Sequence, residues 1–90
     1  MQVRVHIFIY GEVQGVFFRR TAKSKAEELG IVGWVRNRPD GCVETVAQGS
    51  KSGVEKFIAW CKKGPPFAKV EKVEVEWRKS LEAFEDFSII

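Results

Sequence analysis

Apolar and polar residues alternate at the start of the chain, which is the pattern of a strand with one buried face. The alternation covers residues 3–10. Its apolar side is Val3, Val5, Ile7 and Ile9, and its other side is Arg4, His6, Phe8 and Tyr10. The pattern predicts further strands over residues 33–37, 42–48, 70–77 and 87–90.

Two segments instead place apolar residues three or four positions apart, as a helix with one buried side does. Residues 19–29 and 51–63 have this spacing. The buried sides are expected to be Phe18, Ala22, Ala26 and Leu29 in the first, and Val54, Phe57, Ile58 and Cys61 in the second. We expect Gly30 to end the first helix, because glycine readily adopts the left-handed conformation found there. The second helix should end at residues 64–66, Gly-Pro-Pro, because proline cannot continue a helix.

The segment between the helices is predicted to be a pair of strands joined by a turn. Residues 38–41, Arg-Pro-Asp-Gly, have the chemistry of a tight turn. In the strand that follows, one side should carry Val43, Thr45 and Ala47, and the outer side Cys42, Glu44, Val46 and Gln48. Cys42 and the core residue Cys61 would therefore face apart, which argues against a disulfide between them.

The order of elements is βαββαβ followed by one more strand. Right-handed crossovers then favour an α+β fold, the ferredoxin-like βαββαβ sandwich. We expect a mostly antiparallel sheet covered on one face by two helices, with a short terminal strand. The 90 residues suit a single domain spanning residues 1–90.

Composition narrows the class of protein but does not name a ligand. Hydrophobic residues make up 44% of the chain and charged residues 30%, as in ordinary globular domains. No apolar run reaches the length of about 18–20 residues that spans a bilayer, and the start lacks a signal-peptide cleavage site. We therefore expect a cytoplasmic protein with reduced thiols and no membrane partner. The net charge of +3 favours anionic ligands in general.

The loop before the first helix is the strongest candidate for chemistry. It contains Gly11 and Gly15 and leads into Arg19 at the start of the helix. Backbone N–H groups in such a loop can converge on an anion, and a guanidinium can bind two phosphate oxygens at once. A plain strand-to-helix connection with a solvated arginine fits the same spacing. No Gly-Lys-Ser/Thr follows, so a nucleotide triphosphate loop is not indicated.

Three other features have a structural and a functional interpretation. Asn37 is either a turn residue or an amide that holds a water molecule. His6, the one histidine, is expected to be solvated or locally bonded, with no second ligand for a metal. An open face with Phe8, Trp34 and Arg36 would suit RNA, although the strand at 42–48 lacks the aromatic residues of an RNA-recognition domain.

The chain resembles the acylphosphatase family in two signatures. Residues 9–19, Ile-Tyr-Gly-Glu-Val-Gln-Gly-Val-Phe-Phe-Arg, match the family's G-x-V-Q-G-V-x-F-R loop. Residues 33–43 and Gly49 match its G-W-V-x-N-x-x-x-G-x-V segment with a trailing glycine. The Gly-Pro-Pro turn and residues 87–89, Phe-Ser-Ile, are also similar to family members. The similarity extends over nearly the whole chain.

The resemblance implies a monomeric enzyme that hydrolyses acyl phosphates, without a metal or organic cofactor. Arg19 would bind the substrate phosphate, and Asn37 would position the attacking water. The backbone cradle for the phosphate would be Gln14, Gly15, Val16, Phe17 and Phe18. Inorganic phosphate is expected as product and competitive inhibitor, and no nucleic acid is expected as a partner.

The chain departs from the family pattern at Phe17, often glycine or cysteine, at Arg38, in some members threonine, and at Ile90, where some members have arginine and tyrosine. Two alternatives stay open. One is a domain that handles carbamoyl phosphate, as at the start of hydrogenase-maturation carbamoyltransferases. The other is an RNA-binding module.

Overall fold

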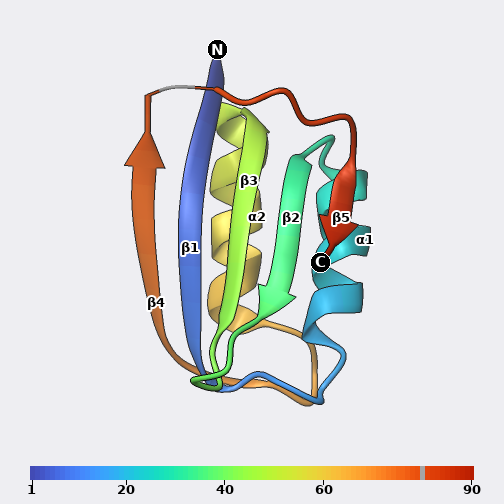
Figure 1. The fold of residues 1–90 in the computed structure, drawn as a ribbon, viewed down its shortest axis with the longest axis vertical. Helices are drawn as coiled ribbons and strands as arrows, with labels where there is room; N and C mark the ends of the chain where they lie inside the picture. Colours follow the sequence, from blue (N-terminus) through green and yellow to red (C-terminus); the bar gives the residue numbers. More distant parts are fainter. Residues whose placement is uncertain (80) are drawn as a thin grey trace.

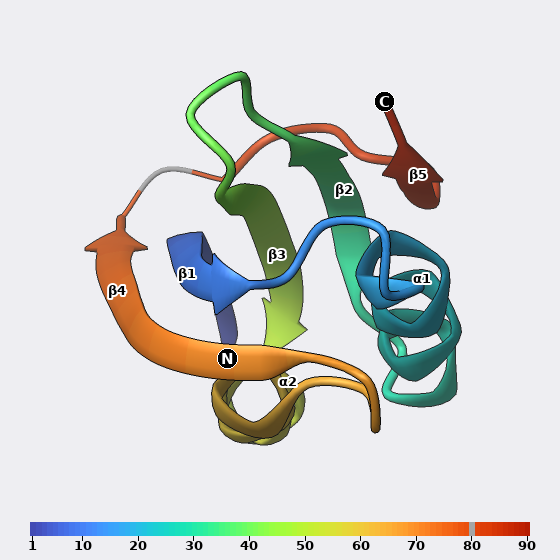
Figure 2. The same cartoon turned by 90° about the horizontal axis from the view of Figure 1, so that it is seen from below.

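The computed structural model describes residues 1–79 and 81–90. Five strands form one sheet in the order β4-β1-β3-β2-β5. The strands are β1 (Gln2–Glu12), β2 (Val32–Asn37), β3 (Val43–Ser50), β4 (Lys69–Arg78) and β5 (Phe87–Ile89). The helices are α1 (Phe18–Glu28) and α2 (Lys51–Lys63), and both lie on the same face of the sheet (Figures 1 and 2).

Strand pairing confirms the predicted ferredoxin-like α+β fold. β1 is antiparallel to both β3 and β4, and β2 is antiparallel to β3. Among the described strands, only β5, the short terminal strand, pairs in parallel, with β2. Each predicted element is present, and its ends shift by at most two residues. β1 is longer than predicted because residues 11–12 still pair with β4 beyond a bulge at Tyr10.

The core lies between the sheet and the two helices. Val5, Ile7 and Ile9 are fully buried, as the alternation predicted. They meet the apolar sides of the helices, which include Phe18, Ala22 and Ala26 from α1 and Val54, Phe57, Ile58 and Cys61 from α2. Both cysteines are buried and free. Neither helix is long and apolar enough to cross a membrane, among the residues that the structure describes.

Local hydrogen bonds account for the helix ends. Gly30 has a φ of 69°, and its N–H donates to Glu27 O, while the N–H of Ile31 donates to Ala26 O. This is the glycine-dependent motif that closes a helix, so the predicted stop is confirmed. At the start of α2, the Ser50 hydroxyl accepts a bond of 3.0 Å from the N–H of Gly53.

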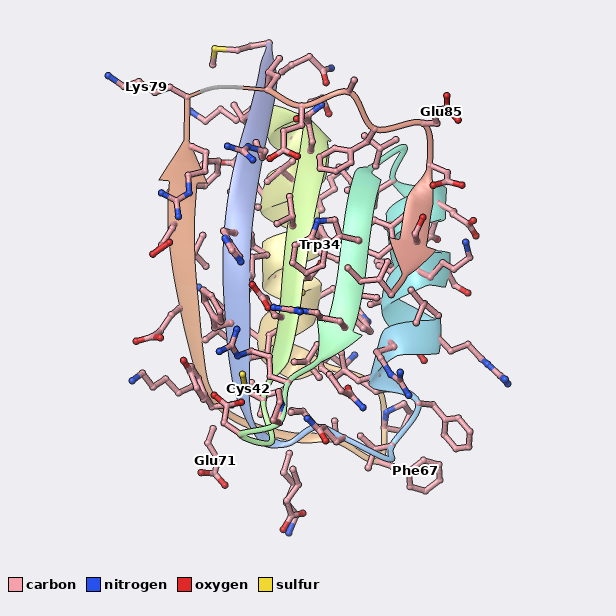
Figure 3. The ribbon with its side chains drawn as sticks, in the orientation of Figure 1. Trp34, Cys42, Phe67, Glu71, Lys79 and Glu85 are labelled. Atoms are coloured by element: carbon pink, nitrogen blue, oxygen red, sulfur yellow. The ribbon has the colours of Figure 1, made fainter. Side chains whose placement is uncertain are left out.

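The two sides of β3 are divided as predicted, with Val43 and Ala47 in the core beside the helices, but the outer side is buried as well. Cys42, Glu44, Val46 and Gln48 are all between 2% and 7% exposed. Long side chains of the neighbouring strands, including Trp34, cover this face (Figure 3). The segment after β4 also crosses it, since the Gln48 amide donates to Glu82 O and accepts from the N–H of Glu82. The side of β3 that faces away from the helices is therefore also shielded from solvent, by side chains of neighbouring strands and by the segment after β4.

Glu44 is the centre of an ion cluster on this second face. Its carboxylate accepts from His6 Nε2 at 2.6 Å, from Arg36 Nε at 2.7 Å and from an Arg38 guanidinium nitrogen at 3.2 Å. Burial opposes ionisation of Glu44, but these donors outweigh it and hold its pKa below the ordinary value. His6 was expected to be solvated or locally bonded, and the structure shows it bonded to Glu44.

Substitution of Glu44 should remove an acid-sensitive part of the stability. Because its folded-state pKa is lowered, ionised Glu44 stabilises the fold above the unfolded-state pKa of about 4.3. That stabilisation is lost as the pH falls through the folded-state value. Glu44→Gln should therefore lower the free energy of unfolding at neutral pH by about 1–3 kcal/mol. It should also flatten the decline of stability below about pH 5.

Urea unfolding measured across this pH range tests the prediction, with Glu71→Gln as the control. Glu71 is an exposed carboxylate that projects from β4 (Figure 3). Equal pH dependence of Glu44→Gln and the wild type would contradict it.

Candidate active site

The ends of β1 and β2 lie at the same edge of the sheet. Both strands are antiparallel to β3, which lies between them, so they run in the same direction. β1 continues into the loop at residues 13–17 and then into α1, while β2 ends at Asn37 (Figure 1). A pocket of about 340 Å³ lies at this edge. Its lining residues are Val13, Gly15, Phe17, Phe18, Arg19, Arg20, Asn37 and Ile89.

The loop has an unusual backbone. Gly15 has a φ of 75° and Phe17 a φ of 65°, so two residues separated by Val16 are left-handed. Alternation of this kind turns successive N–H groups toward one side, where they form an anion-binding concavity. Glycine adopts this conformation freely, but a residue with a Cβ loses about 1–2 kcal/mol in it. Val13, only 1% exposed, anchors the start of the loop in the core.

The first turn of α1 adds further free donors to the pocket. Thr21 bonds back to Phe17 O through its N–H at 3.0 Å and through its hydroxyl at 2.8 Å. The N–H groups before Thr21 have no carbonyl one turn earlier in the helix, and they carry the partial positive charge of the helix start. Phe17 caps the helix without a side-chain bond, and the first turn contains no acidic residue. No acidic side chain in the first turn therefore compensates this charge.

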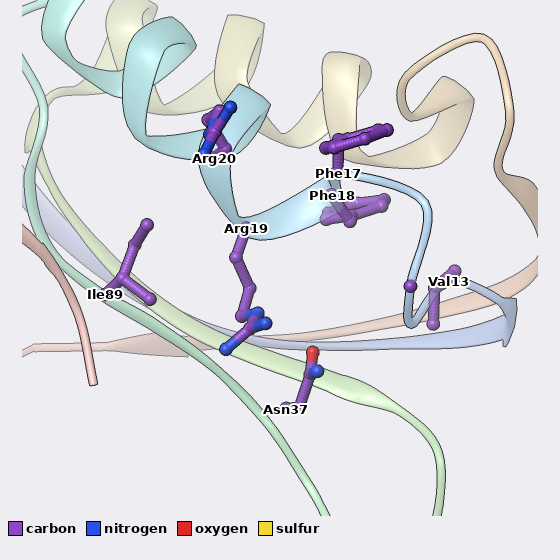
Figure 4. A pocket seen from close by; sticks show the side chains of 8 residues that line it. Val13, Phe17, Phe18, Arg19, Arg20, Asn37 and Ile89 are labelled. Atoms are coloured by element: carbon purple, nitrogen blue, oxygen red, sulfur yellow. The ribbon is translucent and has the colours of Figure 1, made fainter.

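Two arginines in the pocket are without an ionic partner. Neither Arg19 nor Arg20 makes an ion pair with any residue that the structure describes. The Arg19 side chain extends from the start of α1 toward Asn37 (Figure 4). Arg36 and Arg38, by contrast, are held by Glu44 on the other face. The pocket arginines are thus the ones available to an anionic ligand.

Asn37 carries the most informative single atom of the site. Its Oδ1 is buried and has no hydrogen-bond partner among the described residues. Buried acceptors are nearly always bonded, because an unmade bond costs about 1–3 kcal/mol. An acceptor that lines a pocket beside a guanidinium is therefore placed for a water or ligand donor (Figure 4).

The side chain of Gln14 has a position that the sequence did not reveal. Only its backbone was expected to contribute to the phosphate cradle. In the structure its Nε2 donates to Arg38 O at 2.8 Å and to Cys42 O at 3.0 Å. One amide thus ties the loop of β1 to the turn that follows Asn37.

The structure brings most of the predicted site residues together. Gly15, Phe17, Phe18, Arg19 and Asn37 line the pocket, whereas Gln14 and Val16 belong to the loop without lining it. Sequence reasoning missed Arg20, although its place next to Arg19 in the first turn could have suggested it. It also missed Ile89, which reaches the pocket because β5 pairs with β2.

The pocket is built for binding and orientation, not for proton transfer by a side chain. No carboxylate, imidazole or thiol is among its lining residues. His6 is bonded to Glu44 on the other face of the sheet. Burial and the neighbouring Asp40 raise the pKa of Cys42 to about 11, so this thiol stays protonated. Within residues 1–79 and 81–90, no three His, Cys, Asp or Glu residues are grouped as metal ligands.

Comparison with known proteins gives the family. The family model described as acylphosphatase matches residues 5–89. The chain belongs to the acylphosphatase family. An acylphosphatase of Pyrobaculum calidifontis is 53% identical over 89 residues, which are 98% of this chain and 81% of that protein.

Solved structures of two kinds are similar to this member of the acylphosphatase family. The crystal structure of the acylphosphatase from Bacillus subtilis has a TM-score of 0.95 and 39% identity, and the match covers 100% of this chain and 99% of that one. The structure of T. kodakarensis HypF has a TM-score of 0.83 and 30% identity, but the match covers only 12% of that chain.

The Gln14 bridge can be tested by replacing Gln14 with an apolar residue of similar length, which cannot donate a hydrogen bond. Gln14→Met removes both hydrogen bonds, while Arg38 O and Cys42 O keep those from the N–H groups of Gly41 and Arg38. The free energy of unfolding should therefore fall by about 1 kcal/mol. Binding of inorganic phosphate should also weaken, because the loop loses its attachment to the turn. Urea unfolding and calorimetric titration with phosphate measure the two effects. Gln2→Met, at an exposed position of β1, is the control; equal results for both variants would contradict the bridge.

Proposed function

We propose that this protein hydrolyses the carboxyl–phosphate bond of acyl phosphates, which yields a carboxylate and inorganic phosphate. The observation that carries the proposal is the unpartnered, buried Oδ1 of Asn37 in the same pocket as the unpaired guanidinium of Arg19. Asn37 Oδ1 can accept a hydrogen bond from a water, and the Arg19 guanidinium can bind a phosphate. Membership of the acylphosphatase family supports the same reaction.

The phosphate is proposed to lie in the left-handed loop. Backbone N–H groups of Gln14, Gly15, Val16, Phe17 and Phe18 form the cradle, and Arg19 binds two phosphate oxygens through its planar fork. These donors are fixed before the substrate arrives, so they stabilise developing charge without reorganising. Helix α1 adds its partial positive charge at the same place.

Asn37 is proposed to orient the attacking water. The water donates one hydrogen to Oδ1, which directs a lone pair of its oxygen toward phosphorus, in line with the bond that breaks. A bond forms between the water oxygen and phosphorus, and the phosphorus–oxygen bond to the acyl group breaks. The carboxylate leaves with the electron pair. Positioning of this kind is the main demand of a loose phosphoryl transition state.

The reaction does not need a general acid from the protein. A carboxylate is already a good leaving group, so it departs without protonation. We propose that the proton of the water passes to an oxygen of the transferred phosphate. This route agrees with a pocket whose lining residues include no histidine and no carboxylate.

Several accompanying expectations belong to the same proposal. The enzyme acts without a metal, as a monomer, and inorganic phosphate inhibits it competitively, because the cradle binds the phosphate more than the acyl group. The cytoplasmic location expected from the sequence stays a prediction.

The two alternatives from the sequence are less well supported. Carbamoyl phosphate stays an alternative because the same site would bind its phosphate. The match over 99% of the Bacillus subtilis acylphosphatase favours simple acyl phosphates. RNA binding would need free basic side chains on the face of Phe8, Trp34 and Arg36. Arg36 and the nearby Arg38 are instead ion-paired with Glu44.

Alanine substitutions at the two proposed catalytic residues test the assignment. Loss of one well-placed transition-state donor costs about 3–4 kcal/mol, or roughly 10²–10³ in rate. Arg19→Ala and Asn37→Ala should each lose at least that much in kcat for benzoyl phosphate. The assay is run with excess EDTA, and circular dichroism confirms that the variants fold.

Arg78→Ala is the matched control, because Arg78 is a surface arginine of β4 paired with Glu76. It should keep the wild-type rate. Wild-type turnover that EDTA abolishes would refute metal independence. Near-normal activity in either folded pocket variant would remove that residue from the mechanism.

A further inference from the structure

The pocket is larger than a phosphate requires. A phosphate has only five heavy atoms, whereas the pocket volume of about 340 Å³ is roughly ten times the ~30 Å³ that one water molecule takes in the liquid. The polar groups, Arg19, Arg20 and Asn37, account for only part of the lining. Hydrocarbon side chains and the backbone of Gly15 form the rest. The remaining space is where the other half of the substrate would lie.

Phe17 is strained without being buried. It is the one residue other than glycine with a positive φ among those that the structure describes, and the residue is 62% exposed. An aromatic residue is among the least suited to this conformation, and an exposed ring gains little from burial in the folded state. Strain that folding does not offset points to a role at the site.

Ile89 lies on the other side of Arg19 from Phe17 (Figure 4). It lines the same pocket and is 43% exposed. Its place is well fixed, because it pairs with Val35 and the next N–H, of Ile90, donates to Val35 O at 3.0 Å. The strand is also held to α1, since Lys23 Nζ donates to Phe87 O at 2.8 Å. The backbone that carries this exposed apolar side chain is thus fixed beside the pocket.

We infer that Phe17 and Ile89 form a subsite for the acyl group, and that it selects apolar acyl phosphates, aromatic ones above all. This inference rests on the proposed function. The phosphate occupies the cradle beside Arg19 and Asn37, and the acyl group lies between the ring of Phe17 and the side chain of Ile89. Contact with these walls removes apolar surface of both partners from water. A small acyl group such as acetyl reaches neither wall fully.

The test compares two substrates that share the phosphate and differ in the acyl group. The measured quantity is the ratio of kcat/KM for benzoyl phosphate to kcat/KM for acetyl phosphate. A general loss at the cradle cancels in this ratio, so it reports the acyl group alone. The ratio should fall about tenfold in Phe17→Ala and in Ile89→Ala, the size of effect typical of a few hydrocarbon contacts in a pocket.

Phe67→Ala is the control, because Phe67 is an exposed phenylalanine, 74% accessible, that does not line the pocket. It should keep the wild-type ratio. An unchanged ratio in either pocket variant overturns the subsite. So does a higher kcat/KM for succinyl phosphate than for benzoyl phosphate that is lost in Arg20→Ala, because the acyl group would then be recognised by charge.

A binding measurement separates failure of the subsite from failure of the proposed function. Wild-type protein that hydrolyses neither acyl phosphate refutes the proposed function. Calorimetric titration with phenylphosphonate and methylphosphonate then tests the walls without any reaction. Tighter binding of phenylphosphonate that is lost in Ile89→Ala supports the subsite, and equal binding of both phosphonates overturns it.

Discussion

The antiparallel pairing of β3 with both of its neighbours determines where the candidate site forms. It makes β1 and β2 run in the same direction, so that their ends meet at one edge of the sheet. The loop before Arg19 and the side chain of Asn37 are brought together in this way, although Asn37 comes 18 positions after Arg19 in the sequence. Gln14 then fixes the two segments to each other through the carbonyl groups of Arg38 and Cys42.

The site combines features that a stable fold would otherwise avoid. It has two unpaired arginines, a helix start without an acidic cap, a left-handed phenylalanine and a buried amide oxygen without a partner. The backbone of Phe17 and the unbonded Asn37 oxygen cost stability, and the exposed arginines and the free N–H groups of the helix start leave positive charge at the pocket. Their concentration in one pocket is a physical reason to regard this pocket as the functional one.

Much of the fold could be predicted from the sequence, because strand alternation and helix spacing record which side is buried. Gly30 predicted the end of α1, because glycine readily adopts the left-handed conformation that closes a helix. The burial of the second face of β3 could not be predicted, since residues distant in sequence, such as Glu82, cover it. The grouping of Arg19 with Asn37 was expected from the resemblance. The Gln14 bridge and the position of Ile89 depend on tertiary packing and parallel pairing, for which no local pattern exists.

The central claim is that a water held at Asn37 attacks phosphorus and not the acyl carbon. Hydrolysis of benzoyl phosphate in water enriched in oxygen-18 tests it most directly. Mass spectrometry of the products after a single turnover shows which of them carries the heavy oxygen. The proposed mechanism predicts label in inorganic phosphate and none in benzoate. Label in benzoate would mean attack at the carbonyl carbon and would contradict the roles proposed for Arg19 and Asn37.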